Sequence, residues 1–157
     1  MCFIWAKERL SLNDMNLESI PSTPEFDRSG LLKHVLVQLK IKRDGDHGPA
    51  HWARVRLHGL RVGAKRGADL LVVELFAFLH DCQRLNEYSD PYHGKRAAEF
   101  AAELKGRFFD LRAEQLDKLC HAIQHHSGGT QVCSDDPIAS SEGVHLKLNS
   151  VHLNISI

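Results

Sequence analysis

The chain has 157 residues, of which 43% are hydrophobic and 25% charged, and its formal net charge is zero. These values predict one globular domain with a core of its own, and they give no global electrostatic reason to bind nucleic acid or an acidic membrane. None of the four cysteines forms a C-x-x-C pair, so no zinc ribbon or thioredoxin motif is indicated. With no convincing signal peptide and no apolar run of about 18 residues, we expect a cytoplasmic protein without a membrane partner.

The first half of the chain predicts a loosely attached extension followed by three helices. Residues 1–29 show weak periodicity and end in the turn-rich stretch PSTPEFDRSG. Apolar residues at helical spacing predict a first helix over 31–43, before a run of glycines and a proline. A second helix is expected from 49 to about 63–67, with proline at its first position. The third, over 69–80, is apolar nearly all round, which is typical of a central helix.

The second half of the chain predicts two more helices. The Asp90-Pro91 pair is a start signal for a fourth helix, which should end near Gly106. Asp110 is interpreted as the N-cap of a fifth helix, which the run Ser127-Gly128-Gly129 closes. Helices joined by short loops predict an all-α fold, a bundle of about five or six helices.

The carboxyl-terminal tail differs in character from the helices. The segment 145–157 alternates polar and apolar residues like one strand, and a helical bundle offers a single strand no partner. We therefore divide the chain into an amino-terminal extension (1–29), a helical domain (30–133) and an atypical tail (134–157).

Histidine is unusually frequent, with eleven copies, and several stand at predicted helix ends. His80-Asp81 closes the most hydrophobic helix, where burying an imidazole and a carboxylate is costly unless a metal ion or an ion pair compensates them. His51 begins the preceding helix, His93 lies in the first turn of the fourth, and His126 ends the apolar face of the fifth. Four helix ends can therefore converge, each with a side chain of the metal-ligand type.

The remaining histidines are interpreted more simply. His121 and His125 stand at i, i+4 on one helix face, which is metal-ligand spacing but also common by chance, and that face is offset from the apolar stripe. The others are interpreted as caps or as satisfied polar groups, namely His34, His47, His58, His145 and His152.

Three stretches in this order, DGDHGPAHWARV, LFAFLHDCQRLNEYSDPYHGKRAAEFA and LCHAIQHHSGG, resemble the HD superfamily of metal-dependent phosphohydrolases over residues 44–129. The HD pair alone is a weak motif, whereas the ordered combination is much more specific. The resemblance implies the all-helical HD bundle and a divalent metal, for which Mn, Fe, Co, Ni, Zn or Mg are candidates. It implies metal ligands at His51, His80 and Asp81.

The resemblance also implies roles around these ligands. Asp81, which could bridge two metals, and Arg84 are expected in catalysis, and Arg84 or Lys95 would make a charge-assisted contact with a substrate phosphate. His93, and a histidine of the 125–126 pair for which we favour His126, resemble positions that hold a second metal or contact phosphate in some HD branches. A small phosphorylated substrate is therefore the expected partner, and nucleic acid is not.

One family ligand is missing from this sequence. The final ligand in the family is an aspartate on a later helix, and no aspartate occurs here after Asp136. Asp135 or Asp136 would have to substitute from a loop. We hypothesise that the last twenty or so residues are truncated, frameshifted or otherwise altered.

The expected function is a metal-dependent phosphohydrolase acting on a phosphate ester or nucleotide, impaired by the missing aspartate. Three alternatives remain. The first is a non-catalytic HD-like binding or interaction protein, which the missing ligand favours. The second is a di-iron oxygenase, which would need an intact ligand set. The third is a nucleic-acid-binding module, for which the only support is the basic residues of the first half.

Overall fold

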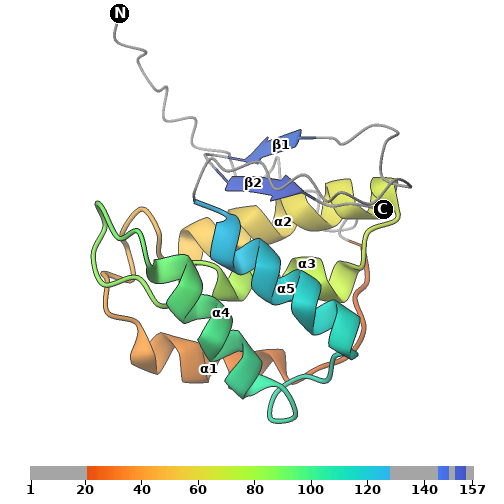
Figure 1. The fold of residues 1–157 in the computed structure, drawn as a ribbon, viewed down its shortest axis with the longest axis horizontal. Coiled ribbons are helices and arrows are strands. Elements are labelled where there is room, and N and C mark those ends of the chain that lie inside the picture. Colours follow the sequence, from red (N-terminus) through yellow and green to blue (C-terminus); the bar gives the residue numbers. More distant parts are fainter. Residues whose placement is uncertain (1–20, 128–144, 149–150, 155–157) are drawn as a thin grey trace, which may run out of the picture.

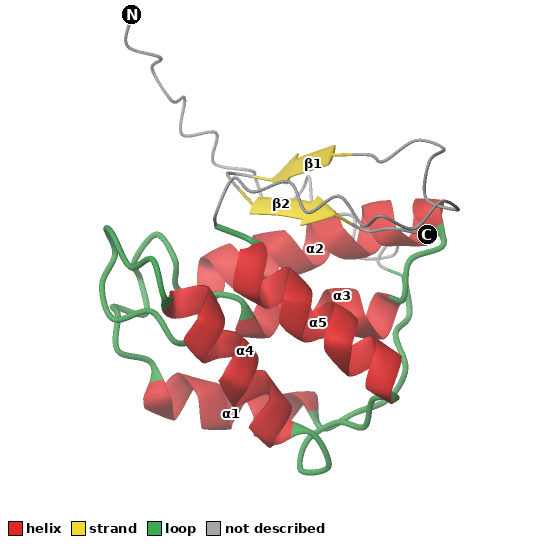
Figure 2. Ribbon diagram, viewed as in Figure 1, coloured by secondary structure: helices red, strands yellow, loops and turns green. Residues whose placement is uncertain are grey.

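The structure is a computed structural model that describes residues 21–127, 145–148 and 151–154 (Figure 1). Its described part contains five helices and then two short strands. In chain order these are α1 (Arg28–Gln38), α2 (Pro49–Arg66), α3 (Leu70–Leu79), α4 (His93–Leu104), α5 (Ala113–His125), β1 (His145–Leu148) and β2 (Val151–Asn154). Figure 2 shows that helices and loops make up the body, which confirms the predicted all-α bundle.

Helix α3 is the central element, as its nearly continuous hydrophobicity predicts. It packs against α2, α4 and α5, and all but two of its ten residues are buried. The carboxylate of Asp69 caps its amino terminus by accepting from the main-chain N–H groups of Leu71 and Val72. Its apolar length falls short of a membrane span, and so does that of every other helix in the described ranges. The end of α3 therefore delivers His80 into the middle of the bundle.

Helices α4 and α5 approach each other closely where the two helices carry their site histidines. Gly94, in the first turn of α4, is buried against the last turn of α5. A Cβ atom at this position would lie 2.7 Å from the carbonyl oxygen of Ile123 and 2.8 Å from that of Gln124. Only glycine permits this approach, and His93 precedes it directly.

Three predicted helix starts are wrong, and capping explains them. Helix α1 spans 28–38: the Asp27 carboxylate accepts from the N–H of Gly30 and starts the helix early, and the helix also ends five residues before the predicted end at 43. Asp90 does not cap α4, because its carboxylate instead accepts from the N–H of Leu85 and pairs with Arg96. Asp110 does not cap α5, which begins after Arg112. By contrast, α2 runs from Pro49 and stops before Gly67 at a φ of 71°, as predicted.

The predicted single strand of the tail is also wrong, because the alternating segment pairs with itself. Strands β1 and β2 form an antiparallel pair in which Leu146 lies opposite Leu153. The alternating segment thus supplies both strands of the pair, so each strand has a partner. Asp135 and Asp136, the predicted substitutes for the family's last ligand, lie outside the described residues.

Residues just before α1 contact the bundle through a buried carboxylate. Glu74, in the middle of α3, is fully buried and forms ion pairs with Arg28 and with Arg56 of α2. The hydroxyl of Thr23 also donates to Glu74. This part of the predicted extension is therefore fastened to α2 and α3.

Candidate metal centre

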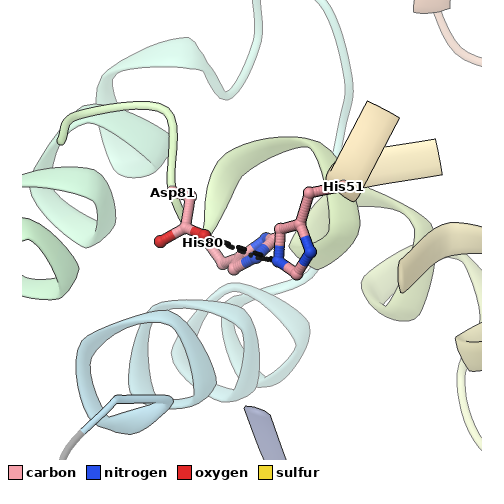
Figure 3. Close-up of side chains that lie close together, drawn as sticks. All are labelled: His51, His80 and Asp81. Atoms are coloured by element: carbon pink, nitrogen blue, oxygen red, sulfur yellow. Dashed lines mark hydrogen bonds and ion pairs between the residues drawn. The ribbon is translucent and has the colours of Figure 1, made fainter. Parts of the chain in front are cut away.

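The end of α3 and the start of α2 bring three predicted ligands together (Figure 3). The Nε2 atoms of His51 and His80 lie 3.1 Å apart, and both face the same oxygen of Asp81. That oxygen, Oδ2, is 3.5 Å from His51 Nε2 and 3.1 Å from His80 Nε2. Ligand atoms around a metal at about 2.1 Å stand roughly 3.0–3.4 Å apart, so this spacing suits a metal ion.

The ring orientation of His80 is set by the helix that precedes it. Its Nδ1 atom lies 3.2 Å from the carbonyl oxygens of Phe76 and Ala77. Because a carbonyl oxygen only accepts hydrogen bonds, Nδ1 carries the hydrogen and the Nε2 lone pair faces His51 and Asp81. A hydrogen bond of this kind is the usual way to orient a metal-binding histidine.

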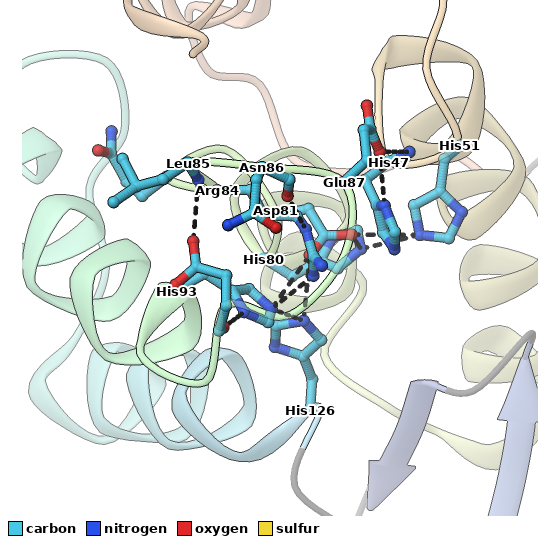
Figure 4. A network of polar contacts seen from close by, with 12 residues as sticks. His47, His51, His80, Asp81, Arg84, Leu85, Asn86, Glu87, His93 and His126 are labelled. Atoms are coloured by element: carbon cyan, nitrogen blue, oxygen red, sulfur yellow. Dashed lines mark hydrogen bonds and ion pairs between the residues drawn. The ribbon is translucent and has the colours of Figure 1, made fainter. Parts of the chain in front are cut away.

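The second oxygen of Asp81 faces two further histidines (Figure 4). His93 comes from the first turn of α4 and His126 from the end of α5. The Nε2 atom of each lies 3.3 Å from Asp81 Oδ1, and the two Nε2 atoms are 3.0 Å apart. Asp81 thus joins two groups of three buried side chains, and each group could hold a metal ion.

The second group places lone pairs against one another. The Nδ1 atom of His93 donates to the carbonyl of Asp90, and that of His126 donates to the carbonyl of Ile123 at 2.6 Å. Both Nε2 atoms therefore present lone pairs in the neutral state, at 3.0 Å from each other and facing a carboxylate oxygen. Facing acceptors repel unless a cation or an extra proton lies among them, and here Arg84 brings one nitrogen to His93 Nε2 at 3.2 Å and to Asp81 Oδ1 at 3.4 Å.

Electrostatics favour the neutral imidazoles that a metal needs. Burial, followed by the charge of His80, lowers the pKa of His51 to about 4. Burial likewise lowers the pKa of His126, although Asp81 opposes it. For Asp81, burial alone would raise the pKa, but the surrounding histidines outweigh it and hold the pKa far below the usual range. Near neutral pH the site therefore presents two or more neutral imidazoles and one carboxylate.

Arg84 lies in the site, but its donors are occupied. One terminal nitrogen faces Asp81 Oδ1 at 3.4 Å and His93 Nε2 at 3.2 Å. The other donates to the carbonyl of Tyr88 at 3.0 Å, and Nε donates to the carbonyl of Asn86 at 3.3 Å. Arg84 thus links the loop between α3 and α4 to Asp81, and it offers no donor to His126 among these contacts.

Lys95, the other predicted phosphate contact, is exposed on α4 and is not brought into either group. It stands two positions after His93, and residues at i, i+2 of a helix do not face each other. The i, i+4 pair His121 and His125 has ring centroids 4.7 Å apart, but it belongs to neither group. His34 is half-buried, stacks on Phe100 and lies at 2.8 Å from the side-chain amide of Gln38, in keeping with its interpretation as a satisfied polar group.

One pair beside the site was missed by sequence reasoning. His47 and Glu87 form an ion pair at 2.8 Å, and the ring of His47 lies 6.0 Å from that of His51. The main-chain N–H of His47 also donates to the same carboxylate. The two residues lie in loops 40 positions apart, so no spacing in the sequence connects them. They join the loop before α2 to the loop after α3, next to the first group.

Comparison with family models, with curated proteins and with solved structures gives no match to this sequence. The resemblance to the HD superfamily therefore stays a prediction. Among the described residues, Asp81 is the only carboxylate that belongs to either histidine group.

Proposed function

We propose that this chain is an HD-type metal-dependent phosphohydrolase whose substrate is a small phosphate ester or a nucleotide. The proposal rests on one observation: several histidine Nε2 atoms point at the carboxylate of Asp81. Three rings donate through Nδ1 to main-chain carbonyls, so their Nε2 atoms face the carboxylate of Asp81, and that of His93 also faces a nitrogen of Arg84. Such an arrangement is stabilised by a divalent cation, and a mixed histidine and carboxylate set suits Mn, Fe, Co, Ni, Zn or Mg.

A divalent metal bound there would supply a water of lowered pKa and would offset the charge on phosphoryl oxygens. The chain's own residues prepare the site for this. His51 stays neutral because its pKa is lowered to about 4, the Nδ1 contacts of His80 orient its ring, and Asp81 stays ionised because its pKa is held far below the usual range. Arg84 pairs with the second oxygen of Asp81, and His93 and His126 place their Nε2 atoms 3.3 Å from the same oxygen. Burial of these residues excludes competing water.

The HD family's final aspartate ligand has no counterpart after Asp136, and we expect its loss to weaken metal binding and activity. Without that ligand the site has one more open coordination position and one more positive charge, so metal affinity falls. This observation favours a second candidate, a non-catalytic HD-like binding protein that keeps the metal or the fold without turnover. Both candidates contain the same two histidine groups, and they differ only in whether the protein hydrolyses a substrate.

Metal content of the purified protein tests the site itself. We expect near-stoichiometric transition metal in the wild type, and loss of most of it in His80→Ala, because His80 Nε2 faces both His51 and Asp81. His121→Ala is the matched control, because His121 is exposed on α5 and belongs to neither group. Equal metal content in all three proteins, or no metal in the wild type, would overturn the metal centre.

Turnover separates the enzyme from the binding protein. The wild type is assayed with nucleotides and a generic aryl phosphate, each with Mn, Ni, Co or Mg added. Hydrolysis that disappears in His80→Ala supports the phosphohydrolase. A folded, metal-loaded protein that hydrolyses none of these compounds supports the non-catalytic candidate.

A further inference from the structure

The proposed reaction needs a cation for the substrate phosphate, and Arg84 is poorly placed to provide it. Its side chain is only 7% exposed, and all three of its nitrogens face partners within the chain. Two of those partners are main-chain carbonyls of its own loop. Contact with a phosphate would therefore break existing hydrogen bonds, whose loss in a buried position is costly.

Arg54 has the opposite properties. It is exposed on α2, three residues after His51, so the two side chains are neighbours on one helix face. No carboxylate within the described ranges pairs with it. A free guanidinium thus stands beside the first histidine group.

The surroundings of Arg54 on α2 are positive along the whole helix. The helix carries five arginine and lysine residues and no carboxylate of its own. Counting from His51, the positions i+3, i+7, i+10 and i+14 form one stripe, and all of them are basic residues or histidine, namely Arg54, His58, Arg61 and Lys65. Such a stripe attracts anions toward the helix end at which His51 lies.

We propose that Arg54 is the residue that binds the substrate's phosphate group, and that Arg84 is a positioning residue which holds the loop and Asp81. This inference rests on the proposed phosphohydrolase function, because it assigns the phosphate of that same substrate. The sequence placed Arg54 in the HWARV stretch and among the basic residues of the first half, but gave it no role. The planar guanidinium of Arg54 matches two oxygens of a phosphate, whereas a lysine would offer a point charge.

Binding of inorganic phosphate to the Mn-loaded protein tests this assignment by calorimetry. We expect Arg54→Gln to weaken phosphate binding at least about tenfold, because a charge-assisted contact is lost. Arg54→Lys should recover part of the affinity. The matched control is Lys65→Gln, which removes the same charge from the same stripe about 16 Å further along α2 and should change affinity less than about twofold. Metal content is measured for each protein and should stay at the wild-type level.

The outcomes separate this inference from the proposed function. If the wild type holds metal and binds phosphate, and Arg54→Gln binds it equally well, the role of Arg54 is overturned while the metal centre stands. An equal loss in Arg54→Gln and Lys65→Gln also overturns it, because the effect is then only general charge. If the wild type holds no metal, the proposed function and this inference fail together. Where turnover is measurable, Arg54→Gln should raise KM more than it lowers kcat.

Discussion

The guanidinium of Arg84 meets four partners, two main-chain carbonyls of its loop and two side chains of the site. The loop it holds contains Tyr88, which is 90% exposed. A surface loop with few buried side chains depends on such hydrogen bonds to keep a single conformation. The residue-scale role of Arg84 is thus to hold the loop against the site.

This role predicts that Arg84→Ala frees the loop. Cleavage by chymotrypsin after Tyr88 should accelerate at least about tenfold, because the open loop gains population when charge-assisted hydrogen bonds are lost. Mass spectrometry of the fragments over time measures the cleavage rate. Lys95→Ala, which removes an exposed cation from the neighbouring helix, should leave the rate unchanged. An Arg84→Ala protein cut no faster than the wild type contradicts the role.

At this scale the sequence predicted the residues at helix ends and missed those in loops. His51, His80, His93 and His126 were found because helix periodicity places the ends of helices in space. The pairing of His47 with Glu87 was not found, because loop conformation brings them together and leaves no spacing. The occupied donors of Arg84 were hidden for the same reason, since they contact carbonyls of a loop.

At the scale of elements, the contact between α4 and α5 decides whether His93 meets His126. Any side chain placed at position 94 would clash with α5, because its Cβ atom would lie under 3 Å from two carbonyl oxygens of that helix. In a helix interior, replacing glycine by alanine ordinarily stabilises by about 0.5–1 kcal/mol. The close packing at Gly94 should reverse this sign.

Gly94→Ala is therefore expected to destabilise the protein by about 1–3 kcal/mol, the usual range for overpacking. Urea unfolding followed by circular dichroism gives the free energy of unfolding. Glu99→Ala, at an exposed position of the same helix, serves as the control and should stay near the wild-type value. A stabilised Gly94→Ala protein would mean that the two helices are further apart than in this structure.

The sequence predicted all five helices of the described bundle, but it did not predict where α1, α4 and α5 begin. A capping carboxylate can accept from the helix N–H groups or from groups elsewhere in the fold, and tertiary contacts determine which of these it binds. Asp90 illustrates this, because Arg96 and the main-chain N–H of Leu85 take the carboxylate that would otherwise cap α4. At α3 the two oxygens of Asp69 divide the work, because one caps the helix by accepting from Leu71 and Val72 while the other accepts from Gln115.

At the scale of the whole molecule, Glu74 fastens three parts of the chain at one buried point. Arg28 donates to its two oxygens at 3.0 and 2.8 Å, and Arg56 donates at 2.6 Å. Burial alone would raise the pKa of Glu74, but hydrogen bonds from its partners outweigh burial and lower the pKa. A carboxyl whose pKa is lowered by folding stabilises the protein above its unfolded pKa of about 4.3, and this contribution is lost as the pH falls through the lower folded pKa.

Glu74→Gln should therefore destabilise the protein at pH 7 by roughly 3–5 kcal/mol, because two arginines lose a buried partner. The difference between variant and wild type should begin to shrink below about pH 4, where Glu74 becomes protonated in the unfolded chain, and should be lost as the pH falls through the lower folded pKa. Urea unfolding at a series of pH values measures both quantities. Glu103→Gln, at an exposed position of α4, should follow the wild type throughout. A Glu74→Gln deficit that stays constant down to the acid transition would show that shape, and not the charge of Glu74, holds the segment before α1 against α2 and α3.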